Sequence, residues 1–258
     1  MLSASVSGTL TGHRRLLAAS VAILSAGAWL ALSMSAATNG AAHVHHHGGA
    51  AAAGMPPLVS LLFFVGSWTV MTIAMMLPTS LPVLTTFHAI AGERDDRTGL
   101  VALVIAGYLV TWAAFGASVH AAELGLRQLA LASRWVGEHA WMTGGGLLMA
   151  AGLYQFTPLK HRCLEKCRSP FSFVIEHWQG RDERKQAFRL GVHHGLFCVG
   201  CCWALMLLMF VVGASNVGWM LVLAVVMAVE KNTRWGRHLG VPLGTALLGW
   251  GIVTLVGN

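Results

Sequence analysis

Long apolar runs separated by short polar stretches dominate the chain. Seven of them have roughly the 20 mostly apolar residues that a helix needs to cross a bilayer, namely residues 16–37, 58–90, 99–122, 139–157, 189–213, 217–230 and 239–256. The second run is too long for one straight helix and contains Pro78 and Pro82, so we expect a break within it. The pattern predicts an all-α, polytopic transmembrane helix bundle of about seven spans that forms a single domain over residues 1–258.

The distribution of basic residues tests this count independently, because Lys and Arg collect in cytoplasmic loops. With the N-terminus cytoplasmic and seven spans, all of the 17 Lys and Arg fall on the cytoplasmic side except Arg127 and Arg134. One span more or fewer would scramble this pattern. We therefore expect a cytoplasmic N-terminus and a periplasmic C-terminus.

Composition supports a membrane protein, since 55% of residues are hydrophobic and only 10% are charged. The net charge of +7 lies in short loops and not on one basic face, which argues against a nucleic-acid partner. The first run, at about 22 residues, exceeds the usual apolar core of a signal peptide, so an uncleaved first span is favoured. We expect a multi-pass protein of the bacterial inner membrane, with the lipid bilayer as its surroundings.

Two connecting segments carry residues that bind metals. Residues 38–57 contain no Lys or Arg, face outward in this topology and include His43 and the run His45, His46 and His47, which predicts a flexible outer loop. Residues 158–186 form a cytoplasmic segment that contains Cys163 and Cys167, four residues apart and on one side of a helix. Two thiolates in such a pair can hold copper(I) and pass it on by ligand exchange.

The fifth run carries the most specific chemistry. At about 100° per residue, one arc of about 120° along about 22 Å of helix collects an imidazole, two thiols and two thioethers. These are His194, Cys198, Cys202, Met206 and Met209, with Cys201 beside them. Thiolates and thioethers select copper(I), whereas zinc sites have little use for methionine. Packing alone explains one buried Cys or Met, but three cysteines in five residues favour a site for copper(I).

A second helix offers facing ligands. Met71 and Met75 lie four residues apart, and Pro78 frees a backbone carbonyl nearby. Broken helices in membranes line cavities or bind ions, so this segment is a candidate partner for the fifth run, although core packing explains the two methionines equally well. Glu230, at the end of the sixth run, is expected to be a solvated or paired helix end, and a ligand or proton partner only as an alternative.

Four stretches of the sequence resemble a bacterial family of uncharacterised, predicted metal-binding integral membrane proteins, some of which are labelled copper chaperone. They are residues 68–82 (WTVMTIAMMLPTSLP), 152–170 (GLYQFTPLKHRCLEKCRSP), 191–206 (GVHHGLFCVGCCWALM) and the pair Glu230 and Lys231. The resemblance covers roughly residues 60–255. It implies a membrane protein that handles copper through Met75, Met76, Cys163, Cys167, Cys198, Cys201 and Cys202.

Three functions fit the sequence. The first is copper(I) binding, transfer or delivery, with a copper-requiring protein or membrane complex as a possible recipient. The second is a thiol-disulfide oxidoreductase that uses the C-x-x-C pair Cys198 and Cys201 with Cys163 and Cys167, although the methionines have no role in disulfide exchange. The third is an accessory subunit that packs through small residues such as Gly146 and Ala150. The usual motifs of hydrolases and phosphate-binding enzymes do not occur, so we do not expect an enzyme.

Overall fold

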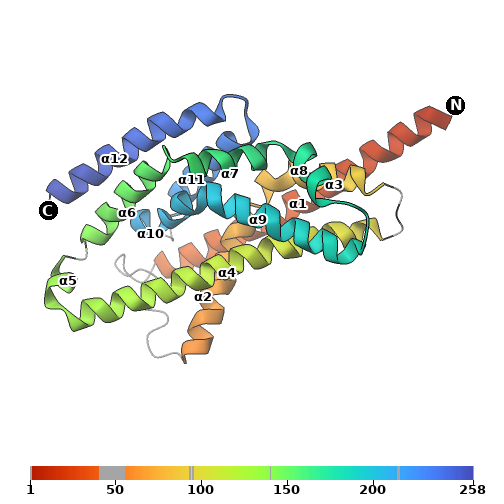
Figure 1. The fold of residues 1–258 in the computed structure, drawn as a ribbon. Coiled ribbons are helices and arrows are strands. Elements are labelled where there is room, and N and C mark those ends of the chain that lie inside the picture. The colour runs from red at the N-terminus through yellow and green to blue at the C-terminus, as the bar shows by residue number, and fades with distance from the viewer. Residues whose placement is uncertain are drawn as a thin grey trace.

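The computed structural model describes residues 2–40, 56–92, 94, 96–139, 141–213 and 216–257, and within them every regular element is helical. The His43 to His47 tract lies outside the described residues. Figure 1 shows the elements, which in chain order are α1 (Leu2–Gly40), α2 (Pro57–Met75), η1 (Pro78–Ser80), α3 (Leu81–Ile90), α4 (Arg97–Ala132), α5 (Arg134–Glu138), α6 (Trp141–Tyr154), α7 (Pro158–Arg168), α8 (Pro170–His177), α9 (Glu183–Leu207), α10 (Met209–Val212), α11 (Val217–Asn232), η2 (Gly236–Leu239) and α12 (Gly240–Val256).

Five of the predicted runs form helices long and apolar enough to cross a membrane. Within the described residues these are Arg14–Ala37, Pro57–Met75, Arg97–Ala132, Glu183–Val212 and Gly236–Val256. The other two runs also form helices, but α6 has 14 residues and α11 has 16, fewer than a straight crossing requires. The all-helical prediction is thus confirmed, together with five candidate spans.

The predicted break in the second run occurs at Pro78. Helix α2 ends at Met75, and the short η1 helix leads into α3. Pro78 has no N–H to donate to the carbonyl of Ala74 four residues before it. That carbonyl instead accepts hydrogen bonds from Ser25 Oγ at 2.9 Å and from Trp29 Nε1 at 3.1 Å. The freed acceptor therefore attaches α1 to α2.

Helices α4 and α9 form the closest contact in the bundle, and they run side by side in the same direction (Figure 1). A β-carbon on Gly191 would lie 2.0 Å from the carbonyl oxygen of Val104, and one on Gly107 would lie 2.2 Å from that of Phe188. Glycine at both positions lets the two backbones touch, as small residues do between membrane helices. This contact fixes the inward face of α9, on which the cysteines lie.

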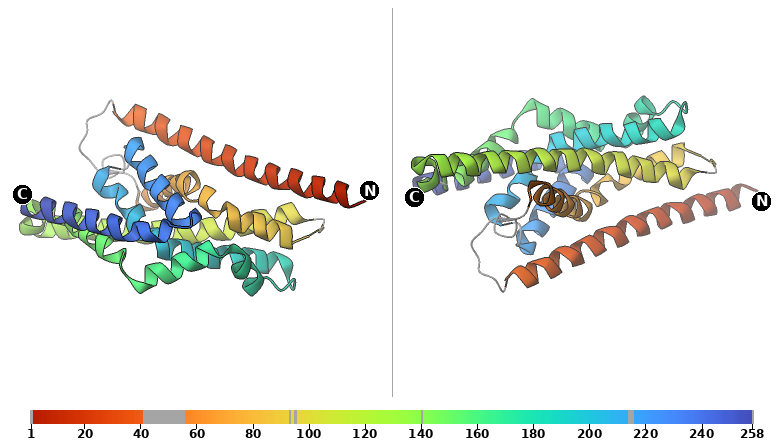
Figure 2. Two further views of the ribbon diagram at one scale, coloured as in Figure 1. Left: turned by 90° about the horizontal axis from the view of Figure 1, so that it is seen from above. Right: turned by 90° about the horizontal axis from the view of Figure 1, so that it is seen from below.

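The remaining helices flank this pair. Helices α6 and α12 pack antiparallel, with Gly145 of α6 against Leu255 and Gly152 against Leu248. Both views of Figure 2 place α1 along one edge of the bundle and α7 and α8 along the opposite edge. Helix α7 packs against α9 and α11, which brings the chain's two groups of cysteines together.

Candidate metal centre

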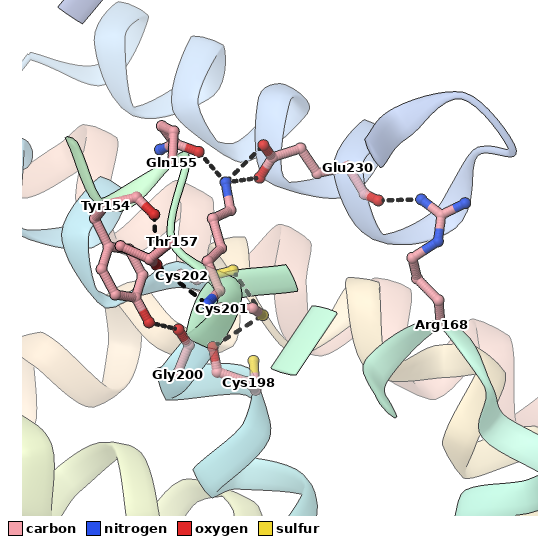
Figure 3. Close-up of polar contacts among 10 residues, drawn as sticks. Tyr154, Gln155, Thr157, Arg168, Cys198, Gly200, Cys201, Cys202 and Glu230 are labelled. Atoms are coloured by element: carbon pink, nitrogen blue, oxygen red, sulfur yellow. Dashed lines mark hydrogen bonds and ion pairs between the residues drawn. The ribbon is translucent and has the colours of Figure 1, made fainter. Parts of the chain in front are cut away.

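Three thiols on α9 face the protein interior. Cys201 and Cys202 follow Cys198 by three and four residues and so lie on the same side of the helix, and each of the three is at most 1% exposed. Cys201 Sγ lies 3.3 Å from Cys202 Sγ and 3.2 Å from the carbonyl oxygen of Cys198, as Figure 3 shows. Leu196, on the other side of the helix, is exposed, as expected for a lipid-facing side chain.

The α7 cysteines reach the same place. Cys163 and Cys167 are buried and, like the other three cysteines, free of disulfides. Cys167 Sγ lies 3.9 Å from Cys201 Sγ, and a β-carbon on Gly200 would lie only 2.6 Å from Cys163 Sγ, so Gly200 makes room for α7. Helix α7 thus carries this pair into contact with α9, a contact that the sequence pattern does not predict.

The methionines are buried but differ in their contacts. Met76 lies directly after α2, and its Sδ is 3.6 Å from Nζ of Lys231, which also contacts Cys198. Within the described residues, no hydrogen bond links the other four candidate methionines to the thiols, namely Met71, Met75, Met206 and Met209. The face predicted to run unbroken to Met209 ends earlier, because α9 stops at Leu207 and Met209 begins α10.

Lys231 is the residue at this site whose role sequence reasoning missed. Its side chain is buried, and Nζ lies 2.9 Å from Cys198 Sγ and 3.2 Å from Thr79 Oγ1. Tyr108 Oη lies 3.0 Å from the same sulfur. The signal in the sequence was a lysine beside an acid at the end of an apolar run, which is also how an ordinary solvated helix end looks.

His194 lies one helical turn from Cys198 and is also buried. Its Nε2 is 3.2 Å from Ser80 Oγ, and its ring stacks on that of Tyr108 at 5.5 Å between centroids. Nδ1 has no hydrogen-bond partner among the described residues, so one ring nitrogen remains available as a ligand.

A buried ion pair adjoins the thiols on the α11 side. Nζ of Lys160 on α7 lies 2.7 and 3.0 Å from the two carboxylate oxygens of Glu230 and also contacts Oε1 of Gln155. Arg168 donates to the backbone oxygen of Glu230 at 2.6 Å, as Figure 3 shows. Glu230 is only 1% exposed, so of the two expectations for it, a solvated end is wrong and a paired one is confirmed.

Thiol, thioether and imidazole groups lie close together in the protein interior. Within the described ranges, no group of three or more His, Cys, Asp or Glu residues is placed to hold a metal ion. The donors present are thiols, a thioether and an imidazole, a set suited to copper(I) more than to zinc or to hard cations.

Over the residues that the structure describes, the fold and site define an all-helical protein with five candidate membrane-spanning helices and a buried group of thiols. Residues 65–254 match the model of a family described as copper chaperone (PpoB2). Because the match covers more than half of the sequence, the chain belongs to this copper chaperone family, and the resemblance seen in the sequence is confirmed. Neither the search of curated proteins nor that of solved structures found a match.

Proposed function

We propose that this protein binds copper(I) inside the membrane and passes it to a recipient. The observation that carries the proposal is the convergence of Cys167, Cys198, Cys201, Cys202 and Met76, drawn from α7, α9 and the end of α2, in a buried interior. Neighbouring sulfurs allow an ion to move by ligand exchange, and burial protects thiols from oxidation. The copper chaperone family name supports the same role.

We further propose one transmembrane domain with seven crossings of the bacterial inner membrane, N-terminus inside and C-terminus outside. Helices α4 and α9 point the same way, so the chain between them must return across the membrane. Helix α6 followed by α7 supplies that return, and α11 supplies the corresponding return between α9 and α12. The segments that lead into α4 and α9, which the Arg94–Glu183 ion pair joins, then lie on the cytoplasmic side with Arg97, Arg184 and Lys185, as the positive-inside rule requires.

The test is copper(I) titration of the detergent-purified protein under anaerobic, reducing conditions, with elemental analysis of the washed product. We expect about one or more copper ions per chain in the wild type and a loss of copper in the double variant Cys198→Ser, Cys202→Ser. An unchanged stoichiometry in that variant would reject the α9 thiols as the site.

A matched pair of methionine variants refines this test. Met76→Leu removes a thioether at the site, whereas Met149→Leu removes one that packs on Gly251 between α6 and α12. We expect Met76→Leu to weaken copper(I) binding by about tenfold, or about 1.4 kcal/mol, and Met149→Leu to leave it unchanged. Equal effects would show that the loss comes from packing and not from coordination.

The same preparation separates this proposal from thiol-disulfide exchange. An oxidoreductase would show cysteines that cycle between reduced and oxidised forms, seen by thiol trapping and mass spectrometry, with no bound copper. We expect all five thiols to be trapped in the reduced state once copper is removed, and a parallel sample that is not trapped to retain its copper. Copurification of a stoichiometric partner without copper would instead support an accessory subunit.

A further inference from the structure

The ammonium of Lys231 lies at a point where three elements converge. The sulfur of Cys198 on α9 is 2.9 Å away, Thr79 Oγ1 on η1 is 3.2 Å away and Met76 Sδ, directly after α2, is 3.6 Å away. The residue is buried. A thiol, a thioether and a hydroxyl thus surround a single positive charge, as ligands surround a bound ion.

This environment is unusual for a buried lysine. Burying an ammonium is costly unless an anion compensates it, and a carboxylate is the ordinary partner. Lys160 has such a partner in Glu230, the residue next to Lys231 in the sequence. Across the described part of the chain, no carboxylate oxygen lies within 4.0 Å of Lys231 Nζ. The polarisable sulfur atoms are what stabilise the charge.

We propose that the point held by the Lys231 ammonium is the position that copper(I) takes, with Cys198 and Met76 as ligands, and that Lys231 is a resident cation which copper displaces. The inference rests on the proposed copper(I) function and specifies where and how the ion enters. Copper(I) and ammonium both carry one positive charge, and the Cys198 thiol releases its proton to water as the sulfur–copper(I) bond forms. The sulfurs that hold ammonium loosely bind copper(I) far more strongly.

The Lys231 ammonium can move away from the sulfur atoms toward the C-terminal end of α11. This ammonium sits on a flexible four-carbon stem, and the residue lies in the last turn of α11, which ends at Asn232. The last carbonyls of a helix and its dipole favour a cation there. No bond is made or broken in the lysine during this exchange. The ammonium only moves from the sulfurs toward the end of α11.

A displaced cation that stays nearby gives the site a preference for monovalent ions. The electrostatic repulsion between the ammonium and the bound ion is twice as large for a divalent ion as for copper(I) at the same position. At an effective dielectric constant of about 20, a unit charge about 8 Å away lowers affinity by roughly tenfold or more per charge on the ion. Lys231 would therefore favour copper(I) over soft divalent ions such as cadmium.

The first experiment compares affinities for copper(I) and for cadmium(II) at one pH in the wild type, Lys231→Leu and Lys231→Arg. Leucine removes the charge without adding a sulfur ligand, and the ratio of the two affinities cancels the cost of deprotonating the shared thiol. We expect Lys231→Leu to reduce the preference for copper(I) by about tenfold or more and Lys231→Arg to preserve it. An unchanged ratio in Lys231→Leu would overturn the proposal.

A second experiment needs no variant and so decides the question even if Lys231→Leu fails to fold. Wild-type protein, with and without copper(I), is treated briefly with an amine-modifying reagent, and labelled lysines are identified by mass spectrometry. We expect Lys231 to be protected without copper and labelled with it, while Lys160, which is also buried, stays protected in both states. If copper binds and Lys231 remains as protected as Lys160, the displacement is wrong while the copper function stands. If no copper binds, both fail.

Discussion

Two buried lysines lie near the end of α11, Lys160 on the neighbouring helix α7 and Lys231 on α11 itself. Their ammonium groups have different partners. Lys160 reaches the carboxylate of Glu230, whereas Lys231, the next residue along the chain, reaches Cys198, Met76 and Thr79. The Lys160 ammonium and the Glu230 carboxylate compensate each other, because removing either one would leave the other as an unpaired buried charge. The Lys231 ammonium has neighbours that remain neutral and stable without it. A buried charge is thus structural in one region and replaceable in the other.

The largest expected effect comes from breaking the first pair. Lys160→Met leaves the Glu230 carboxylate buried without its cation, and we expect a loss of roughly 3 to 5 kcal/mol in the free energy of unfolding. Chemical unfolding of the purified protein in mixed micelles measures it. The double variant Lys160→Met, Glu230→Leu replaces the pair by apolar groups and should recover most of the loss. A double variant as unstable as the single one would show that α7 packing, and not the stranded charge, sets the cost.

An intermediate effect is expected where α7 meets α9. Gly200→Ala adds a methyl group 2.6 Å from Cys163 Sγ, and the Lys160–Glu230 pair prevents α7 from moving away freely. We expect a cost of about 1 to 3 kcal/mol and a lower yield of Cys167 to Cys201 cross-links with a short thiol-reactive reagent. Gly146→Ala, on α6 with nothing within 4 Å of the added carbon, is the control and should change neither. Cross-linking that stays at the wild-type level in Gly200→Ala would contradict the contact.

The smallest effect on stability is expected at the second lysine. Lys231→Met exchanges an ammonium for a thioether of similar length and leaves a thiol and a hydroxyl that need no counter-charge. We expect a change of less than about 1 kcal/mol in the free energy of unfolding, measured in the same micelles. A loss as large as that of Lys160→Met would mean that Lys231 is as structural as Lys160 and would remove the contrast between the two regions.

Local pattern was sufficient for much of the fold. Apolar runs of about 20 residues located the five candidate spans, and Pro78 located the break, because both depend on nearby residues alone. The spacing of Cys198, Cys201 and Cys202 likewise predicted a shared buried face, since helical periodicity fixes it. The weaker predictions were the two short runs, where α6 and α11 have too few residues to be recognised as spans by length alone.

Long-range pairing was beyond the sequence pattern. Lys160 is 70 positions from Glu230, and Lys231 is 33 positions from Cys198. At the level of sequence these lysines enter only through the positive-inside rule, which considers where positive charges lie and not which residues they contact. For the same reason the sequence does not indicate what α7, rich in Lys and Arg, would contact. Its inward face, with Lys160, Cys163 and Cys167, packs toward α9 and α11.

The proline break that shapes the site also explains how the chain's first helix is held. Helix α1 lies before the region that matches the family, and it docks through Ser25 and Trp29 onto the single carbonyl oxygen that Pro78 leaves without a donor. Without α1 that oxygen would face hydrocarbon, where an unmet acceptor costs several kcal/mol. The first helix thus supplies the donors for an acceptor that the proline break leaves open, and this role does not depend on which ion the protein binds.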